Sequence, residues 1–110
     1  MKQYFNKLVR DKIPDIISND NKKCVIKILN KNDYNVQLNL KLIEECNEVI
    51  NAKSDDEKIE ELADVLEVIY SIAENMGVNL DHLENVRMKK KLKRGGFASK
   101  IFLKYVSNEK

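Results

Sequence analysis

The chain has 110 residues, of which 43% are hydrophobic and 35% charged, with a formal net charge of +2. This length predicts a single domain, residues 1–110, with a modest core. The sequence has no apolar run of the roughly 20 residues that span a bilayer and no apolar signal segment near its start. We therefore expect a cytoplasmic protein that does not bind membranes.

The small net charge conceals a segregation of charge along the chain. Residues 33–84 hold 14 acidic and three basic residues, a net charge of −11, whereas residues 87–104 hold eight basic residues and no acidic one. A basic tail of this kind is typical of nucleic-acid binding. It also fits an enzyme that holds a cation on its acids while basic residues bind the phosphates of a substrate.

The first third of the chain predicts short elements. Residues 10–18 predict a short helix with Pro14 in its first turn, and residues 19–21 predict a turn. Residues 24–29 are rich in β-branched side chains and bounded by polar ones, which predicts a strand. Its only partner would be residues 101–106, so a small two-stranded ribbon from the chain ends stays open as an alternative.

Two long helices are predicted in the middle of the chain. The first runs over residues 33–52 with Asn32 as its cap. The second opens with a capping box at residues 54–57 and ends at Met76, before Gly77. Because apolar residues cover most of the second helix, we expect an all-α antiparallel helical bundle completed by oligomerisation, as a dimer or a dimer of dimers.

A third long helix is predicted in the C-terminal part of the chain. It begins after Asn79 or Asp81 and runs to about Lys93. The stretch Arg94-Gly95-Gly96-Phe97 ends it.

Carboxylates recur at three-residue spacing on the two central helices. Glu45 and Glu48 form one pair, and Glu61 and Asp64 form the other, so antiparallel packing would bring all four together. Glu45 and Glu61 also fall on apolar stripes, where a carboxylate is unfavourable unless it is paired or metal-bound. A solvated helix face is the alternative reading, but four converging acids favour a bound cation.

The spacing Glu-Glu-x-x-Glu, twelve residues, then Glu-x-x-Asp resembles the signature of the all-α nucleoside triphosphate pyrophosphohydrolases. That superfamily includes the MazG-like enzymes, dimeric dUTPases and phosphoribosyl-ATP pyrophosphohydrolases. Two further stretches resemble a MazG-like branch with a house-cleaning role: residues 6–14 and the Arg94-Gly95-Gly96-Phe97 block.

The resemblance implies Mg²⁺-dependent hydrolysis of a nucleoside triphosphate between its α and β phosphates, with Mn²⁺ as a substitute ion. Four matching positions are then the magnesium ligands: Glu45, Glu48, Glu61 and Asp64. Glu44, the first glutamate of the motif, completes the catalytic set as an orienting or water-activating residue.

Basic residues near both ends of the chain are the candidate phosphate-binding residues: Lys7, Arg10, Lys12, Lys91, Arg94 and Lys100. A guanidinium can bind phosphate oxygens bidentately, which favours Arg10 and Arg94.

Two alternatives remain open. Within the enzyme class, the chain could be a phosphoribosyl-ATP pyrophosphohydrolase of histidine biosynthesis. Outside it, the chain could be a non-catalytic helical module that binds a partner or nucleic acid. Acids on the apolar stripes argue against the non-catalytic module, since a pure scaffold gains nothing from them. We expect nucleic-acid binding to be weak and lost at physiological salt, because the acidic middle would repel a phosphate backbone.

Overall fold

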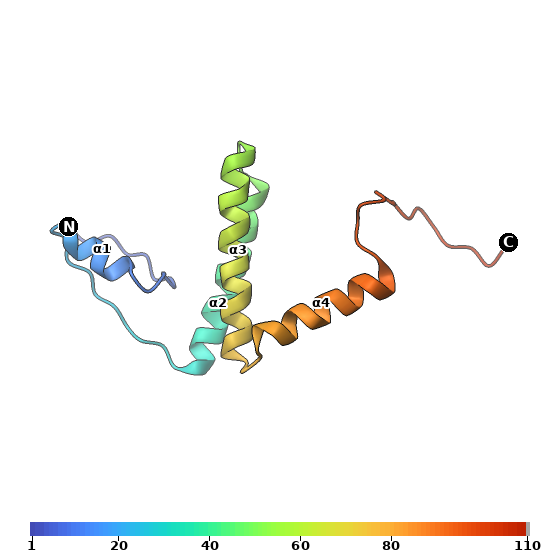
Figure 1. Ribbon diagram of the computed structural model, residues 1–110. Coiled ribbons are helices and arrows are strands. Elements are labelled where there is room, and N and C mark those ends of the chain that lie inside the picture. Colours follow the sequence, from blue (N-terminus) through green and yellow to red (C-terminus); the bar gives the residue numbers. More distant parts are fainter. Residues whose placement is uncertain (110) are drawn as a thin grey trace. The chain divides into compact units, whose positions relative to one another are not determined.

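The structure is a computed structural model that describes residues 1–109. The chain divides into two compact units, Met1–Val78 and a second one from Asn79 onward. The first holds α1 (Ile13–Asn19), α2 (Lys31–Ile50) and α3 (Asp55–Asn75), and the second holds α4 (Leu80–Arg94) (Figure 1). No strand occurs in the described residues, so the predicted all-α class is confirmed. The single-domain organisation stays a prediction.

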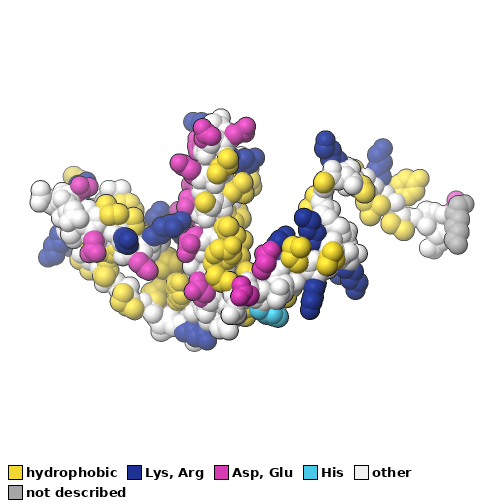
Figure 2. Space-filling model, viewed as in Figure 1, with side chains coloured by type: hydrophobic (Ala, Val, Ile, Leu, Met, Phe, Trp, Pro, Cys, Tyr) yellow, Lys and Arg dark blue, Asp and Glu magenta, His cyan; other side chains and the backbone are white. Residues whose placement is uncertain are grey.

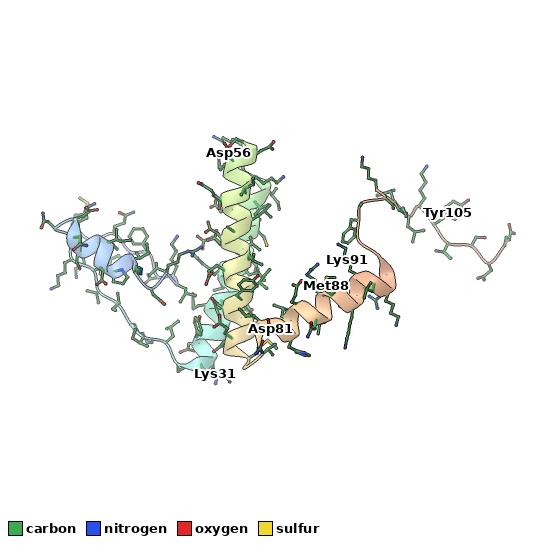
Figure 3. All side chains as sticks on the ribbon, viewed as in Figure 1. Lys31, Asp56, Asp81, Met88, Lys91 and Tyr105 are labelled. Atoms are coloured by element: carbon green, nitrogen blue, oxygen red, sulfur yellow. The ribbon has the colours of Figure 1, made fainter. Side chains whose placement is uncertain are left out.

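An antiparallel hairpin of α2 and α3 forms the centre of the first unit. These are the only two helices that pack on each other within the described part of the chain. Lys31, at the start of α2, and Asp56, in the first turn of α3, lie at opposite ends of the hairpin (Figure 3). Residues on α2 and α3 at matching distances from the connecting loop therefore face each other.

Helix α2 begins two residues earlier than predicted, and its cap is Asn30 instead of Asn32. Asn30 has an extended backbone, and its side-chain oxygen accepts a hydrogen bond of 2.8 Å from the backbone N–H of Asp33. Asn32 lies inside the first turn. Two asparagines stand close together here, and the extended backbone of the first decides which of them caps the helix. The helix also ends at Ile50, two residues before the predicted end.

Ser54 caps the start of α3 and Gly77 follows its end, as predicted, but only the Ser54 half of the predicted capping box forms among the described residues, and the helix ends at Asn75 instead of Met76. The Ser54 hydroxyl accepts a 3.1 Å hydrogen bond from the backbone N–H of Glu57. At the other end Gly77 has a φ of +76°, and the backbone N–H of Val78 donates to the Ala73 carbonyl at 2.9 Å. This left-handed turn closes the last carbonyls of the helix and fixes where α3 stops.

Two predictions near the N-terminus are wrong. Helix α1 begins at Ile13 and not at Arg10, because residues 10–12 form a turn in which the Ile13 N–H donates to the Arg10 carbonyl at 3.0 Å. Residues 24–29 form no strand, and neither do residues 101–106, so the ribbon is absent from the described residues. A two-stranded ribbon is marginal in water without a packed face, and neither segment has a buried residue to supply one.

The second unit consists of α4 and the segment that follows it. The Asn79 side chain accepts a 2.7 Å hydrogen bond from the N–H of Asp81, which settles the cap between the two predicted candidates. Gly95, with a φ of +84°, ends the helix, and its N–H donates to the Lys91 carbonyl at 2.8 Å. No residue of α4 is buried.

The buried core of the described chain is small and lies entirely in the hairpin. It consists of Leu38 from α2 and of Val68 and Ala73 from α3. Figure 2 shows acidic side chains along one side of the hairpin and apolar side chains along the other. Many large apolar side chains of the two helices remain exposed: Val36, Leu40, Ile43, Ile50, Ile59, Leu62 and Leu66. No helix among the described residues is long and apolar enough to cross a membrane.

The Ser54 cap sets the start of α3 and therefore the position of Glu61 and Asp64, about two and three turns further on. We expect Ser54→Ala to lower the free energy of unfolding by about 1 kcal/mol, because an orphan backbone N–H loses its acceptor. Urea unfolding followed by circular dichroism measures the change. Ser54→Asp keeps an acceptor oxygen and should retain wild-type stability. An equal loss in both variants would contradict the capping role.

Candidate metal centre

Three carboxylates from the two helices of the hairpin converge. Glu45 of α2 and Glu61 and Asp64 of α3 each offer a carboxylate oxygen, and these oxygens lie within 4.8 Å of one another. We call them the acid triad. All three residues are partly buried. The triad forms because the three-residue spacing of Glu61 and Asp64 places both on one surface of α3, and the antiparallel packing brings Glu45 opposite them.

Glu48, the fourth predicted ligand, does not belong to the acid triad. It is exposed on α2, one turn beyond Glu45. Its negative charge still acts on the site, because it contributes to raising the pKa of Glu61. Glu48 therefore lies at the edge of the site, close enough for its charge to act on Glu61.

Glu61 has the least favourable environment of the triad. Partial burial raises its pKa most, and the neighbouring carboxylates raise it further. The contributing acids, in decreasing order, are Asp64, Glu48, Glu45 and Glu57. Among the described residues no cation forms an ion pair with Glu61. Ionised Glu61 thus lacks a positively charged partner, whereas Glu45 pairs with Lys41 and Asp64 pairs with Arg10.

Lysines from two parts of the chain contact the acids of α2. Lys7 lies 3.2 Å from one Glu44 oxygen, and Lys41 lies 3.6 Å from the other. Lys41 also lies 3.5 Å from Glu45, and both of these side chains are largely covered. Partial burial works to raise the pKa of Glu44, but the hydrogen bond from Lys7 and the charges of Lys41 and Lys7 outweigh it, so the net shift is downward.

Arg10 contacts the acid triad from the N-terminal segment. Its Nη2 donates to the Asp64 Oδ1 at 2.6 Å, between residues 54 positions apart in the sequence. Lys7 and Arg10 thus connect the irregular segment before α1 to both helices of the hairpin, Lys7 to α2 and Arg10 to α3. The residue 6–14 block therefore contacts the hairpin beside the acid triad through these two side chains.

Four predicted phosphate-binding residues remain, Lys12 in the first unit and three in the second. Lys12 is exposed before α1, and among the described residues it makes no ion pair with an acid. Lys91 and Arg94 lie in the last turn of α4, and Lys100 follows it with a φ of +60°. These three belong to the second unit, and their role stays a prediction.

Lys41 is the residue of this site that the sequence analysis did not single out. It precedes Glu44 and Glu45 by three and four residues, which places all three on one face of α2. That spacing was visible in the sequence. A lysine on an apolar-periodic helix with acids one turn later is a signal of a partly buried ion pair.

The acid triad fits a divalent cation with a preference for oxygen ligands. Two ligands on opposite sides of Mg²⁺ lie about 4.2 Å apart, since each Mg²⁺–oxygen distance is close to 2.1 Å. The triad oxygens, within 4.8 Å of one another, need only a small side-chain adjustment to share one ion. The donor set is carboxylate throughout, as a hard cation requires. A bound ion would also supply the positive charge that Glu61 lacks.

The raised pKa of Glu61 leads to a prediction about pH. An acid whose pKa is higher in the folded state opposes folding once it is ionised, and this opposition disappears as the pH falls below the ordinary glutamate range. Glu61→Gln should therefore raise the melting temperature of the metal-free protein at pH 7. The gain should shrink as the pH falls through the range in which Glu61 takes up its proton. Thermal unfolding in EDTA over a pH series measures it.

Glu84→Gln serves as the control, because the pKa of Glu84 is shifted in the opposite direction to that of Glu61. The hydrogen bond from Arg87 lowers the pKa of Glu84, so removing this carboxylate should give no stabilisation at pH 7. Stabilisation by both substitutions would show only that the protein benefits from a lower acidic charge. Absence of any gain from Glu61→Gln would mean that Glu61 is well solvated.

Residues 6–90 match the family model described as phosphoribosyl-ATP pyrophosphohydrolase. The match covers well over half of the chain. It contains the N-terminal block, the α2–α3 hairpin and the acid triad, and it ends before Arg94. Neither a search of curated proteins nor one of solved structures returns a match.

Proposed function

This chain belongs to the phosphoribosyl-ATP pyrophosphohydrolase family, and we propose that it hydrolyses a nucleoside triphosphate between the α and β phosphates, giving a nucleoside monophosphate and pyrophosphate. The observation that carries the proposal is the acid triad, whose three carboxylates share one location on the hairpin without a cation at Glu61. A triphosphate is a polyanion, so an acidic site can receive it only together with metal ions.

We assign the metal ligands to the acid triad, with Glu48 at its edge. When bound there, Mg²⁺ would supply charge neutralisation of the phosphates and a lowered pKa of a bound water. Mn²⁺, which also accepts carboxylate ligands, is the expected substitute. The protein's own contribution is to hold the carboxylates on two rigid helices, because phosphoryl-type transfer depends mainly on positioning and charge stabilisation.

Glu44 has a different role in this proposal. Its pKa is lowered and its two oxygens contact Lys7 and Lys41, so it stays ionised and fixed in place. A carboxylate held in this way is suited to accept a hydrogen bond from the attacking water and to orient it. Glu44 is less suited to remove and keep a proton from that water, because its lowered pKa makes it a weaker base.

The basic residues are proposed to bind the phosphates. Lys7 and Arg10 already lie beside the acids, and Lys12 follows in the same segment. Lys91, Arg94 and Lys100 are assigned the same role from the second unit. Of these, the arginines offer the bidentate geometry that phosphate oxygens favour.

Phosphoribosyl-ATP is the second candidate substrate, and the family match favours it. The two candidates share a nucleoside triphosphate group, so the same acids and cations would serve both. The residue 6–14 and Arg94-Gly95-Gly96-Phe97 blocks, which resemble the house-cleaning branch, favour the first candidate. Direct comparison of the two substrates decides between them.

Pyrophosphate release from a panel of canonical and modified nucleoside triphosphates and phosphoribosyl-ATP tests the function. We expect turnover that requires Mg²⁺ and stops in EDTA. Asp64→Asn should reduce kcat/KM by at least about 100-fold, because losing a metal ligand removes charge stabilisation of the transition state. Its far-ultraviolet circular dichroism should stay that of the wild type.

Glu74→Gln is the matched control for this experiment. It removes one negative charge from an exposed position on the same helix and should keep wild-type activity. Full activity of Asp64→Asn, or turnover by the wild type that does not depend on a divalent ion, would overturn the proposed function.

We also propose that the protein is a homo-oligomer, at least a dimer. Only three residues of the described chain are buried apolar residues, and large apolar side chains such as Leu62 and Leu66 are exposed on α3. An apolar helix face of this extent favours association with a second copy.

Sedimentation equilibrium at micromolar concentration tests the oligomeric state. We expect the mass of at least two chains of 12.8 kDa each. Leu62→Glu should shift the mass toward that of one chain, because it places a charge on the apolar face, whereas Glu60→Gln on the same helix should have no effect. A wild-type protein that sediments as a single chain would contradict the proposal.

A further inference from the structure

We propose that Arg10 is an internal counter-ion of the metal site, which leaves Asp64 when a divalent ion binds and is thereby released to bind the phosphates of the substrate. This inference rests on the proposed function. It assigns Arg10 two successive partners, a carboxylate in the metal-free protein and a phosphate in the loaded one. Arg10 in this way couples the binding of the metal ion to the binding of the substrate.

The starting point is the contact between Arg10 and the acid triad. One guanidinium nitrogen lies 2.6 Å from one Asp64 oxygen, the shortest ion pair that an N-terminal residue makes with the hairpin. The Arg10 side chain is 59% exposed. It is therefore held to the site by its charge, with solvent on its other side into which it can swing.

Competition for Asp64 follows from charge. Asp64 is a member of the triad whose oxygens all lie within 4.8 Å of one another, so an ion held by the triad would be a close neighbour of the guanidinium. Two cations beside one carboxylate repel each other, and the divalent ion has the larger charge and further carboxylate ligands. Arg10 is the partner with the fewer contacts, and it is the one that leaves.

The Lys7 contact keeps the released arginine near the site. Lys7 lies three residues before Arg10 and pairs with Glu44, which is outside the acid triad. Displacing Arg10 thus leaves the segment attached to α2. The guanidinium moves a short way from a carboxylate to a place where the substrate's phosphates arrive, instead of being lost to solvent.

Lys41 differs from Arg10 in this respect. It belongs to the same helix as its partners Glu44 and Glu45, and its side chain is only 18% exposed. The helix fixes its distance from both acids. Of the cations at the site, Arg10 is the one whose contact with the triad can be exchanged.

Calorimetric titration of Mg²⁺ into the nucleotide-free protein is the first test. Arg10→Gln should bind Mg²⁺ more tightly than the wild type, by about 5-fold or more, because a competing positive charge has been removed. Binding of α,β-methylene ATP in saturating Mg²⁺ should become about 10-fold weaker, as expected for loss of one charge-assisted contact. Lys2→Gln, which removes an unpaired charge from the same end of the described chain, should change neither affinity.

A second measurement uses the wild-type protein and so does not depend on how a variant folds. The side-chain Nε–Hε signal of Arg10 should shift in the ¹⁵N-correlated spectrum as Mg²⁺ saturates the site, and shift again when α,β-methylene ATP is added. An Arg10 signal that does not respond to Mg²⁺ would overturn the proposal. So would unchanged or weaker Mg²⁺ binding by Arg10→Gln, which would make Arg10 a structural link only.

Failure of this inference is distinguishable from failure of the proposed function. If the wild type binds Mg²⁺ and turns over a nucleotide while Arg10→Gln behaves like Lys2→Gln, only the exchange is wrong. If the wild type binds no Mg²⁺ and releases no pyrophosphate, both are wrong.

Discussion

Mutual repulsion of carboxylates across the α2–α3 hairpin is the constraint on which the rest of this structure depends. The helix caps and the antiparallel packing bring Glu45, Glu61 and Asp64 together, and nothing in the hairpin itself neutralises Glu61. The chain offsets the repulsion with cations from outside the triad. The ion pairs of Lys7 with Glu44 and of Arg10 with Asp64 explain why the N-terminal segment, which has no regular secondary structure, lies against both helices.

The same repulsion gives the site its chemical character. Carboxylates that are held together in the folded state destabilise the metal-free protein, and any ligand that binds only the folded state recovers that free energy. A divalent cation is the ligand that relieves it most directly. Under the proposed function, the strain of the metal-free site and its affinity for a metal would have one cause, the placement of three acids of like charge on two helices.

The scarcity of buried side chains is the second constraint. Leu38, Val68 and Ala73 are the only buried apolar residues of the described chain, and they come from the two helices that carry the acid triad. A hairpin with so small a core has little packing energy with which to hold repelling charges together. Association through the exposed apolar side of α3 would add that energy while leaving the acidic side open to substrate.

The sequence by itself determined the local features of this protein. Local sequence set the cap at Ser54 and the helix end at Gly77. Three-residue spacing put Glu61 and Asp64 on one face of α3. Each of these features depends only on neighbours within one or two turns. Helical periodicity likewise predicted the all-α class. It could not choose Asn30 over Asn32 as the cap of α2, since that choice depends on the backbone conformation of the residue itself.

Only the tertiary structure decided which charges meet. Periodicity gives the face of a helix but not its rotation against a neighbour, so it grouped Glu48 with the acid triad although that side chain lies at the edge. The chemistry of the guanidinium predicted phosphate binding for Arg10, whereas packing places this side chain on Asp64, 54 residues away. Local pattern carries no information on such a contact, because Arg10 and Asp64 are far apart in the sequence and meet only through the tertiary arrangement of the N-terminal segment and the hairpin.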